Sequence, residues 1–253
     1  MDYDKTAMPA AYDRARTYQP EVLRLWLEAI SLEVPKTEVD HIIDFGCGTG
    51  RYSGPLSVHF DAELTGIEPS EKMLAEASAK APSDRVRFCR AAGEALPLAD
   101  GCADLVFISM VLHHLADPAR AAMECGRTLR PGGRLALRTG STEQSVSYPY
   151  IPFFSGLLEI IRERLPSRAR IRQLFEDAGL ELASHRVIKH QFAASWPAYA
   201  DKLALRADSF LASLPDPAFN TGLDALRAHA EEQDPGKPIR EDIDFFVFRK
   251  PAA

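Results

Sequence analysis

The chain carries at residues 41–50 the run His41-Ile42-Ile43-Asp44-Phe45-Gly46-Cys47-Gly48-Thr49-Gly50. A short apolar segment ends in an acidic residue, three glycines follow at alternate positions, and a segment that can form a helix comes next. This order predicts a strand, a tight turn and a helix start. Glycine reaches backbone angles that are closed to other residues, and it lets a ligand lie against the main chain. We therefore interpret the run as a turn that binds a polar or anionic ligand group.

Strands and helices are predicted to alternate outward from this turn. The strands are short, apolar and bounded by Gly, Pro or Asp, as expected where helices cover both faces of a parallel sheet. The pattern indicates a doubly wound, Rossmann-like α/β fold whose ligand lies at the C-terminal ends of the strands. Strands are expected at about 40–45, 63–68, 86–91, 103–110 and, after a turn at Pro131-Gly132-Gly133, 134–139; helices are expected at about 20–33, 51–59, 70–80, 118–129 and 167–178.

This alternation changes after residue 140. Residues 148–154 contain too much proline for a regular strand and lead into an apolar helix near 155–164. Beyond them we expect a helix that ends at Gly179, a long strand at 181–192, two helical stretches at about 197–213 and 216–232, and a last strand at 242–249.

Length and composition suit one soluble globular domain, since 46% of the 253 residues are hydrophobic and 26% are charged. The formal net charge is -6, with acidic and basic residues mixed, so we expect no nucleic-acid partner. No apolar run approaches the roughly 20 residues of a membrane span, and residues 1–5 lack the features of a secretory signal, which predicts a cytoplasmic protein. No C-x-x-C pair occurs among Cys47, Cys89, Cys102 and Cys125, so neither a disulfide framework nor a metal site is expected.

Glycine spacing separates two classes of nucleotide-binding turn. A dinucleotide fingerprint would place its third glycine at Arg51, whereas here it is Gly50, and no Gly-Lys-Ser/Thr ending of a phosphate-binding loop is present. Glu68 closes the next strand, 18 residues after Gly50. A carboxylate there can accept hydrogen bonds from both hydroxyls of an unmodified ribose. The alternative is a solvated acid at a strand end.

In these residues the sequence resembles the class I S-adenosylmethionine-dependent methyltransferases, in particular the type 11 group of small-molecule methylating enzymes. The resemblance covers roughly residues 40–140 and depends on four blocks in the family's order, which together are specific for the cofactor but not for the substrate. The blocks are Asp44-Phe45-Gly46-Cys47-Gly48-Thr49-Gly50; Gly66-Ile67-Glu68-Pro69-Ser70-Glu71-Lys72-Met73-Leu74; Gly93-Glu94-Ala95-Leu96-Pro97 with Asp104-Leu105-Val106; and Val111-Leu112-His113-His114-Leu115 with Leu129-Arg130-Pro131-Gly132-Gly133.

The resemblance implies the class I methyltransferase fold, with an antiparallel last strand and an inserted helical cap. It divides the chain into an N-terminal lid and helix (1–36), an S-adenosylmethionine-binding core (37–140), and acceptor-binding cap helices with the completing strands of the same domain (141–253). The implied partner is a small-molecule methyl acceptor, and the implied product is S-adenosylhomocysteine. The oligomeric state is left open between monomer and homodimer.

The resemblance also implies contacts with the cofactor. The turn would face the methionine part and the ribose, and Asp44 would orient the ammonium group; Pro69 and Met73 would pack on the adenine. Many relatives carry an aspartate where this chain has Ala92, so adenine recognition would depend on backbone groups or on Glu94. Tyr12, Arg16 and Tyr18 resemble an N-terminal lid, for which a disordered tail is the alternative. The positions carried over as cofactor-binding are Tyr12, Arg16, Asp44, Gly46, Cys47, Gly48, Gly50, Glu68, Pro69, Met73, Gly93, Glu94, Ser109 and Met110.

Two histidines just beyond the fourth predicted strand are candidates for a catalytic base. Methyl transfer from a sulfonium needs an aligned nucleophile and exclusion of water, and a base only if the acceptor arrives protonated. His114, with His113 second, could remove that proton. Both belong to the family pattern, however, where they can serve packing and hydrogen bonding.

Aromatic residues outside the family pattern are candidates for the acceptor site, and they suggest a flat or apolar small molecule. A core role in a helical cap is the alternative for each. A basic run from Arg162 to Arg172 could meet an acidic substrate, although a solvated helix face explains it as well. The aromatic candidates are Tyr148, Tyr150, Phe153, Phe154, Phe192, Trp196 and Tyr199.

The sequence leaves several functions open. The first is methyl transfer to an O or N atom of a small acceptor, and the second is C-methylation of a quinone-like or lipid-like acceptor. A third is a protein that binds S-adenosylmethionine without turnover, because the turn and Glu68 indicate binding alone. A Rossmann dehydrogenase is the residual alternative.

Overall fold

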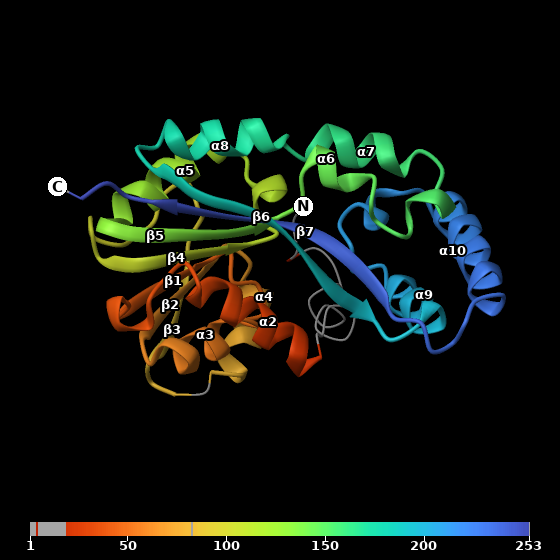
Figure 1. The fold of residues 1–253 in the computed structure, drawn as a ribbon, viewed down its shortest axis with the longest axis horizontal. Coiled ribbons are helices and arrows are strands. Elements are labelled where there is room, and N and C mark those ends of the chain that lie inside the picture. The colour runs from red at the N-terminus through yellow and green to blue at the C-terminus, as the bar shows by residue number, and fades with distance from the viewer. Residues whose placement is uncertain (1–3, 5–18, 82, 253) are drawn as a thin grey trace.

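The computed structural model describes residues 4, 19–81 and 83–252, which form one seven-stranded sheet in the order β3-β2-β1-β4-β5-β7-β6 (Figure 1). The strands β1 to β5 are parallel, and β7 runs antiparallel between β5 and β6. The predicted mostly parallel sheet with an antiparallel last strand is therefore confirmed. The strand bounds are β1 His41–Phe45, β2 Glu63–Glu68, β3 Val86–Arg90, β4 Ala103–Ser109, β5 Leu129–Thr139, β6 Glu181–Ala193 and β7 Ile239–Arg249.

Helices cover both faces of the sheet. Helices α2 (Pro20–Ser31) and α3 (Ser53–Phe60) lie on one face, and α5 (Pro118–Thr128) and α8 (Arg168–Glu176) lie on the other (Figure 1). Successive residues of a strand point to opposite faces, so Ile42 is buried against the first pair of helices and Ile43 against the second. This double burial explains why the central strands are apolar throughout. Helix α4 (Glu71–Ala79) follows β2 and is capped by Ser70, whose hydroxyl accepts from the amide of Met73 at 3.2 Å.

A helical cap gathers at one end of the molecule (Figure 1). Helices α9 (Trp196–Ala204) and α10 (Asp216–Glu231) are inserted between β6 and β7, and α6 (Thr142–Ser145) and α7 (Leu157–Arg164) follow β5. The predicted inserted cap is confirmed. Its position beside the sheet places its aromatic residues within reach of the strand ends.

Two local expectations differ from the structure, and one element was not expected. Strand β5 begins at Leu129, because Pro131-Gly132-Gly133 forms a bulge inside the strand instead of a turn before it. Gly132 allows this bulge with a φ of +81°. The helix expected over 197–213 ends at α9, since Arg206 adopts a left-handed φ of +50°. The four-residue helix α6 was not predicted, since it is too short to show periodicity.

Among the residues that the structure describes, none of the helices is long and apolar enough to cross a membrane. The four cysteines are free thiols. The described part of the chain contains no cluster of three or more His, Cys, Asp or Glu side chains that could hold a metal ion.

Candidate functional site

The glycine turn after β1 uses backbone angles that other residues rarely adopt. Gly46, Gly48 and Gly50 have φ values of +68°, +55° and +73°. The turn is held to the next strand because the amide of Cys47 donates to the carbonyl of Ile67 at 3.0 Å. A Cβ atom on Gly46 would lie 2.5 Å from a methyl group of Val111. Gly46 is therefore required by both conformation and space.

Glu68 ends β2 and connects the turn to the start of α4. Its carboxylate is 7% exposed and accepts from the amide of Gly48 at 3.1 Å and from the amide of Ser70 at 3.0 Å. Burial raises the pKa of Glu68, while these two hydrogen bonds act in the opposite direction. The carboxylate thus fixes the turn and lies at a cleft, where its oxygens can also accept from a ligand.

A cleft of about 270 Å³ lies along this edge of the sheet. Its apolar walls include five residues that sequence reasoning missed, and four of them lie within two residues of the C-terminal end of a strand. The four are Phe45, Ile67, Ala91 and Val111, and the fifth is Leu115. Their place near the strand ends is the signal that could have identified them, because ligands of parallel sheets lie at the C-terminal strand ends. Nine positions predicted to bind cofactor line the cleft: Gly46, Gly48, Glu68, Pro69, Met73, Gly93, Glu94, Ser109 and Met110.

Other predicted cofactor positions lie behind the turn or outside the described residues. Asp44 is 2% exposed and accepts from the hydroxyl of Ser53 at 2.6 Å, and burial raises its pKa to about 7. Burial also raises the pKa of the Cys47 thiol. A Cβ on Gly50 would lie 3.0 Å from Cβ of Ala77, on the side of α4. Neither Asp44, Cys47 nor Gly50 lines the cleft, so they shape the turn from behind it. Tyr12, Arg16 and Tyr18 are outside the described residues.

A second cavity of about 50 Å³ adjoins the cleft on the side of the cap. Met110 and His114 line both spaces, so the cleft and the cavity meet at these two residues. Among the predicted acceptor residues, Tyr148, Tyr150 and Phe192 line this cavity. Residues that were not predicted complete its wall: Arg51, Arg138, Leu203, Ala207, Asp208, Ser209, Phe210, Glu241 and Ile243.

The two histidines occupy different places at this junction. The amide of His114 donates to the carbonyl of Val111 at 2.8 Å, within the short 3-10 helix Leu112–His114. His113 lines the cavity but not the cleft. Its ring stacks on the ring of Phe210, with centroids 5.1 Å apart. The ring centroids of His113 and His114 lie 4.0 Å apart. His114 therefore lies where a proton could leave an acceptor next to the cleft, and His113 lies deeper against the cap.

Four predicted acceptor residues do not line the cavity. Tyr199 is buried within the cap, where its hydroxyl donates to Oε1 of Glu241 at 3.2 Å and so supports the wall from behind. Phe154 is buried with its ring 5.8 Å from that of Phe219. Phe153 and Trp196 form a ring cluster with His229, and Trp196 also contacts the ring of Tyr199.

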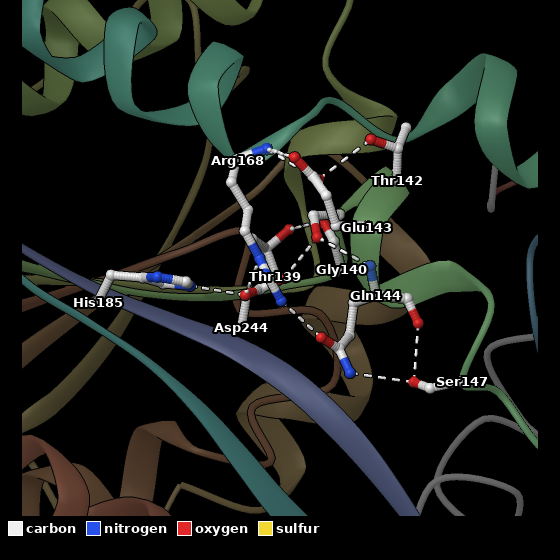
Figure 2. Close-up of polar contacts among 10 residues, drawn as sticks. Thr139, Gly140, Thr142, Glu143, Gln144, Ser147, Arg168, His185 and Asp244 are labelled. Atoms are coloured by element: carbon white, nitrogen blue, oxygen red, sulfur yellow. Dashed lines mark hydrogen bonds and ion pairs between the residues drawn. The ribbon is translucent and has the colours of Figure 1, made fainter.

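A buried polar network joins the cap to the sheet (Figure 2). Its centre is the fully buried carboxylate of Asp244 on β7, which accepts from Nε of Arg168 at 2.9 Å and lies 2.6 Å from Nε2 of His185. The hydroxyl of Ser141 donates to the same carboxylate at 2.5 Å, and Arg168 also donates to Gln144 at 2.7 Å. Arg168 belongs to the basic run that was expected on a solvated helix face or near an acidic substrate. Its side chain instead holds α6 and the chain leading to Tyr148.

Known proteins share this sequence pattern. A family model described as a methyltransferase domain matches residues 43–137. The 27-O-demethylrifamycin SV methyltransferase of Amycolatopsis mediterranei is 29% identical over 237 residues, which is 88% of this chain and 84% of that protein. A malonyl-[acyl-carrier protein] O-methyltransferase of Methylococcus capsulatus is 37% identical over 53% of this chain and 48% of its own length. The demethylmenaquinone methyltransferase of Lactiplantibacillus plantarum is 28% identical, covering 62% of this chain and 77% of that protein.

Solved structures share the fold. A Haemonchus contortus phosphoethanolamine N-methyltransferase 2, solved with S-adenosylhomocysteine, superimposes with a TM-score of 0.67 at 18% identity, over 99% of this chain and 59% of its own. The [4+2]-cyclase SpnF gives a TM-score of 0.63 at 23% identity, over 91% and 81%. The matched domain, the relatives and the glycine turn with Glu68 agree, and the chain belongs to the class I S-adenosylmethionine-dependent methyltransferases.

Proposed function

We propose that this enzyme transfers the methyl group of S-adenosylmethionine to an oxygen atom of a small acceptor that carries an aromatic or apolar part. The observation that carries the proposal is the meeting of two spaces at Met110 and His114. A cofactor in the cleft and an acceptor in the cavity would face each other there. The rings of Tyr148, Tyr150 and Phe192 on the cavity side suit a flat or apolar molecule.

The residues of the cleft fit the cofactor. Glu68 would accept from the ribose hydroxyls, and the left-handed glycines would let the methionine part lie on the backbone. Met73 and Pro69 would pack on the adenine, with Gly93 and Glu94 at its edge. When bound, S-adenosylmethionine supplies a methyl group that its sulfonium charge already activates.

The protein's own contribution would be alignment, exclusion of water and removal of one proton. His114 lines both spaces, and its imidazole would take the hydroxyl proton as the acceptor oxygen gains the methyl group. The aromatic walls and the cap would keep water from the junction. His113, stacked on Phe210, would support His114 from the cap side.

The three parts of the chain would divide this work. Residues 37–140 would hold the cofactor, and residues 141–253 would supply the acceptor wall, to which Tyr148, Phe192, Phe210 and Glu241 belong. We propose residues 1–36 as a lid and helix of the same domain.

Relatives favour oxygen as the methylated atom. The malonyl-carrier relative is an O-methyltransferase by name, and the rifamycin relative, which aligns with 88% of this chain, is named for a 27-O-demethyl compound. C-methylation is the second candidate, because the demethylmenaquinone methyltransferase also aligns with part of this chain. An apolar quinone would suit the aromatic walls equally well.

Turnover assays test the proposal. The enzyme is incubated with S-adenosylmethionine and panels of phenols, other alcohols, amines and quinones, and S-adenosylhomocysteine is measured while mass spectrometry and NMR identify the methylated atom. We expect ethers or esters, and His114→Ala to lower kcat about 100-fold with little change in the Kd for S-adenosylhomocysteine. Unchanged turnover in this variant would remove His114 from the mechanism. C-methylated products would favour the second candidate, and cofactor binding without any product would indicate a non-catalytic binding protein.

A further inference from the structure

Met110 has a backbone conformation that is unusual for its place in the fold. Three non-glycine residues of the described chain have left-handed φ values: Asp61 at +54°, Met110 at +58° and Arg206 at +50°. Asp61 is the C-cap of α3, and Arg206 directly follows Leu205, the C-cap of α9. Helix ends commonly take this conformation. Met110 instead follows a strand, and it lies at the junction of the cleft and the cavity. An outlier at such a site points to function.

The neighbours of Met110 impose this conformation. Its amide donates to the carbonyl of Arg138 at 2.8 Å, which continues the pairing of β4 with β5 by one residue. The next residue, Val111, packs directly on Gly46, where a Cβ atom would come within 2.5 Å of it. The 3-10 helix that carries His114 begins immediately afterwards. The chain must therefore turn from strand to helix at Met110 alone.

We propose that Met110 is a positioning residue that sets the distance and direction between the methyl donor and the acceptor. The left-handed turn holds Met110 where the cleft and the cavity share their wall, which His114 also lines. Displacement at a methyl group requires close alignment of the reacting atoms, and a side chain at the border limits how each reactant can lie. An unbranched thioether can fill that irregular border without a polar group. This inference rests on the proposed function for its kinetic readout.

Substitutions at Met110 can separate side chain from backbone. Met110→Gly accepts the left-handed angle but removes the side chain, and Met110→Leu keeps a similar volume. We expect Met110→Gly to lower kcat about tenfold, with the Kd for S-adenosylhomocysteine changed by less than about threefold. Met110→Leu should retain most of kcat. Asp61→Gly is the matched control, because it replaces another left-handed residue at an exposed site, and it should leave both quantities unchanged.

A binding measurement makes the inference independent of the acceptor. Sinefungin carries an amino group at the place of the transferred methyl, so its affinity relative to S-adenosylhomocysteine reports on the surroundings of that group. Calorimetry should show that the affinity for sinefungin relative to S-adenosylhomocysteine rises about fivefold in Met110→Gly, because water can then reach the amino group. The same ratio should be unchanged in Asp61→Gly. An unchanged ratio in Met110→Gly, or a kcat within about twofold of wild type on a methylated acceptor, would overturn the inference. A shifted ratio without methylation of any acceptor would sustain it while the proposed function fails.

Discussion

The cleft in which we propose the cofactor binds takes its walls from residues 45–116. The cavity proposed for the acceptor takes its walls from segments between residues 51 and 243. In the cleft, successive parallel strands bring their ends to one edge, and Gly46, Gly48 and Gly93 line it with backbone alone. In the cavity, side chains from the turn, from the β4 end and from the cap meet across long sequence separations. One side is thus built by local chain geometry, and the other by tertiary packing.

The two sides are also held together differently. Glu68 fixes the glycine turn through two backbone amides of neighbouring segments. The cap is fixed through side chains, since Asp244 joins Arg168, His185 and Ser141 from three separate elements (Figure 2). Damage to the network should therefore act on the acceptor side, and damage to the turn on the cofactor side.

The largest effect is expected on the acceptor side, for Asp244→Ala. This change removes a fully buried carboxylate and leaves Arg168, His185 and Ser141 without their shared acceptor. Breaking a buried pair in this way costs about 4 kcal/mol of unfolding free energy. Turnover should fall because α6 and the chain leading to Tyr148 lose their anchor.

Chemical denaturation measures that stability, and calorimetry measures the Kd for S-adenosylhomocysteine in the folded variant. Glu176→Ala is the control, since it breaks the exposed Arg172–Glu176 pair and should cost less than about 0.5 kcal/mol. A loss of cofactor affinity as large as the loss of turnover would contradict the separation of the two sides.

A somewhat smaller effect is expected on the cofactor side, for Gly46→Ala. The new Cβ adds left-handed strain and would lie 2.5 Å from Val111, so we expect a loss of about 3 kcal/mol in unfolding free energy. Gly48→Ala has a similar φ but no atom within 4 Å of the new Cβ, and should cost only about 1 kcal/mol. Equal losses in the two variants, measured by denaturation, would show that strain alone and not the contact with Val111 determines the requirement for glycine.

The same contrast explains what could be predicted from the sequence. Gly46 and Glu68 could be placed at a strand-end cleft because their roles depend on neighbours within about one strand–helix unit. Phe192 near the end of β6 and Phe153 between α6 and α7 are both aromatic residues beside the cap helices, yet only Phe192 lines the cavity. Which ring faces inward depends on how α9 and α10 pack, and a single sequence carries no pattern for that packing. The bulge at Pro131-Gly132-Gly133 escaped prediction because pairing with β4 resumes beyond it.

The smallest of these effects concerns a buried acid behind the cofactor turn. Burial raises the pKa of Asp44 to about 7 from an ordinary value of 3.8, despite the hydrogen bond from Ser53. The folded protein therefore holds a proton that the unfolded chain releases. The stability from this group is fully present below about pH 4 and is lost as the pH rises through about 7. Unfolding free energy should fall by about 2 kcal/mol between pH 5 and 7 from this group alone.

Asp44→Asn isolates that contribution, because the amide keeps an oxygen that can accept from Ser53 but does not titrate in this range. Denaturation curves of both proteins at several pH values give the difference in unfolding free energy, in which other titrating groups cancel. We expect wild type to lose stability relative to Asp44→Asn as the pH rises. A constant difference from pH 5 to 7 would mean that Asp44 is already ionised in the folded turn. The turn would then hold a buried carboxylate, and the cofactor side, like the cap, would depend on a stabilised charge.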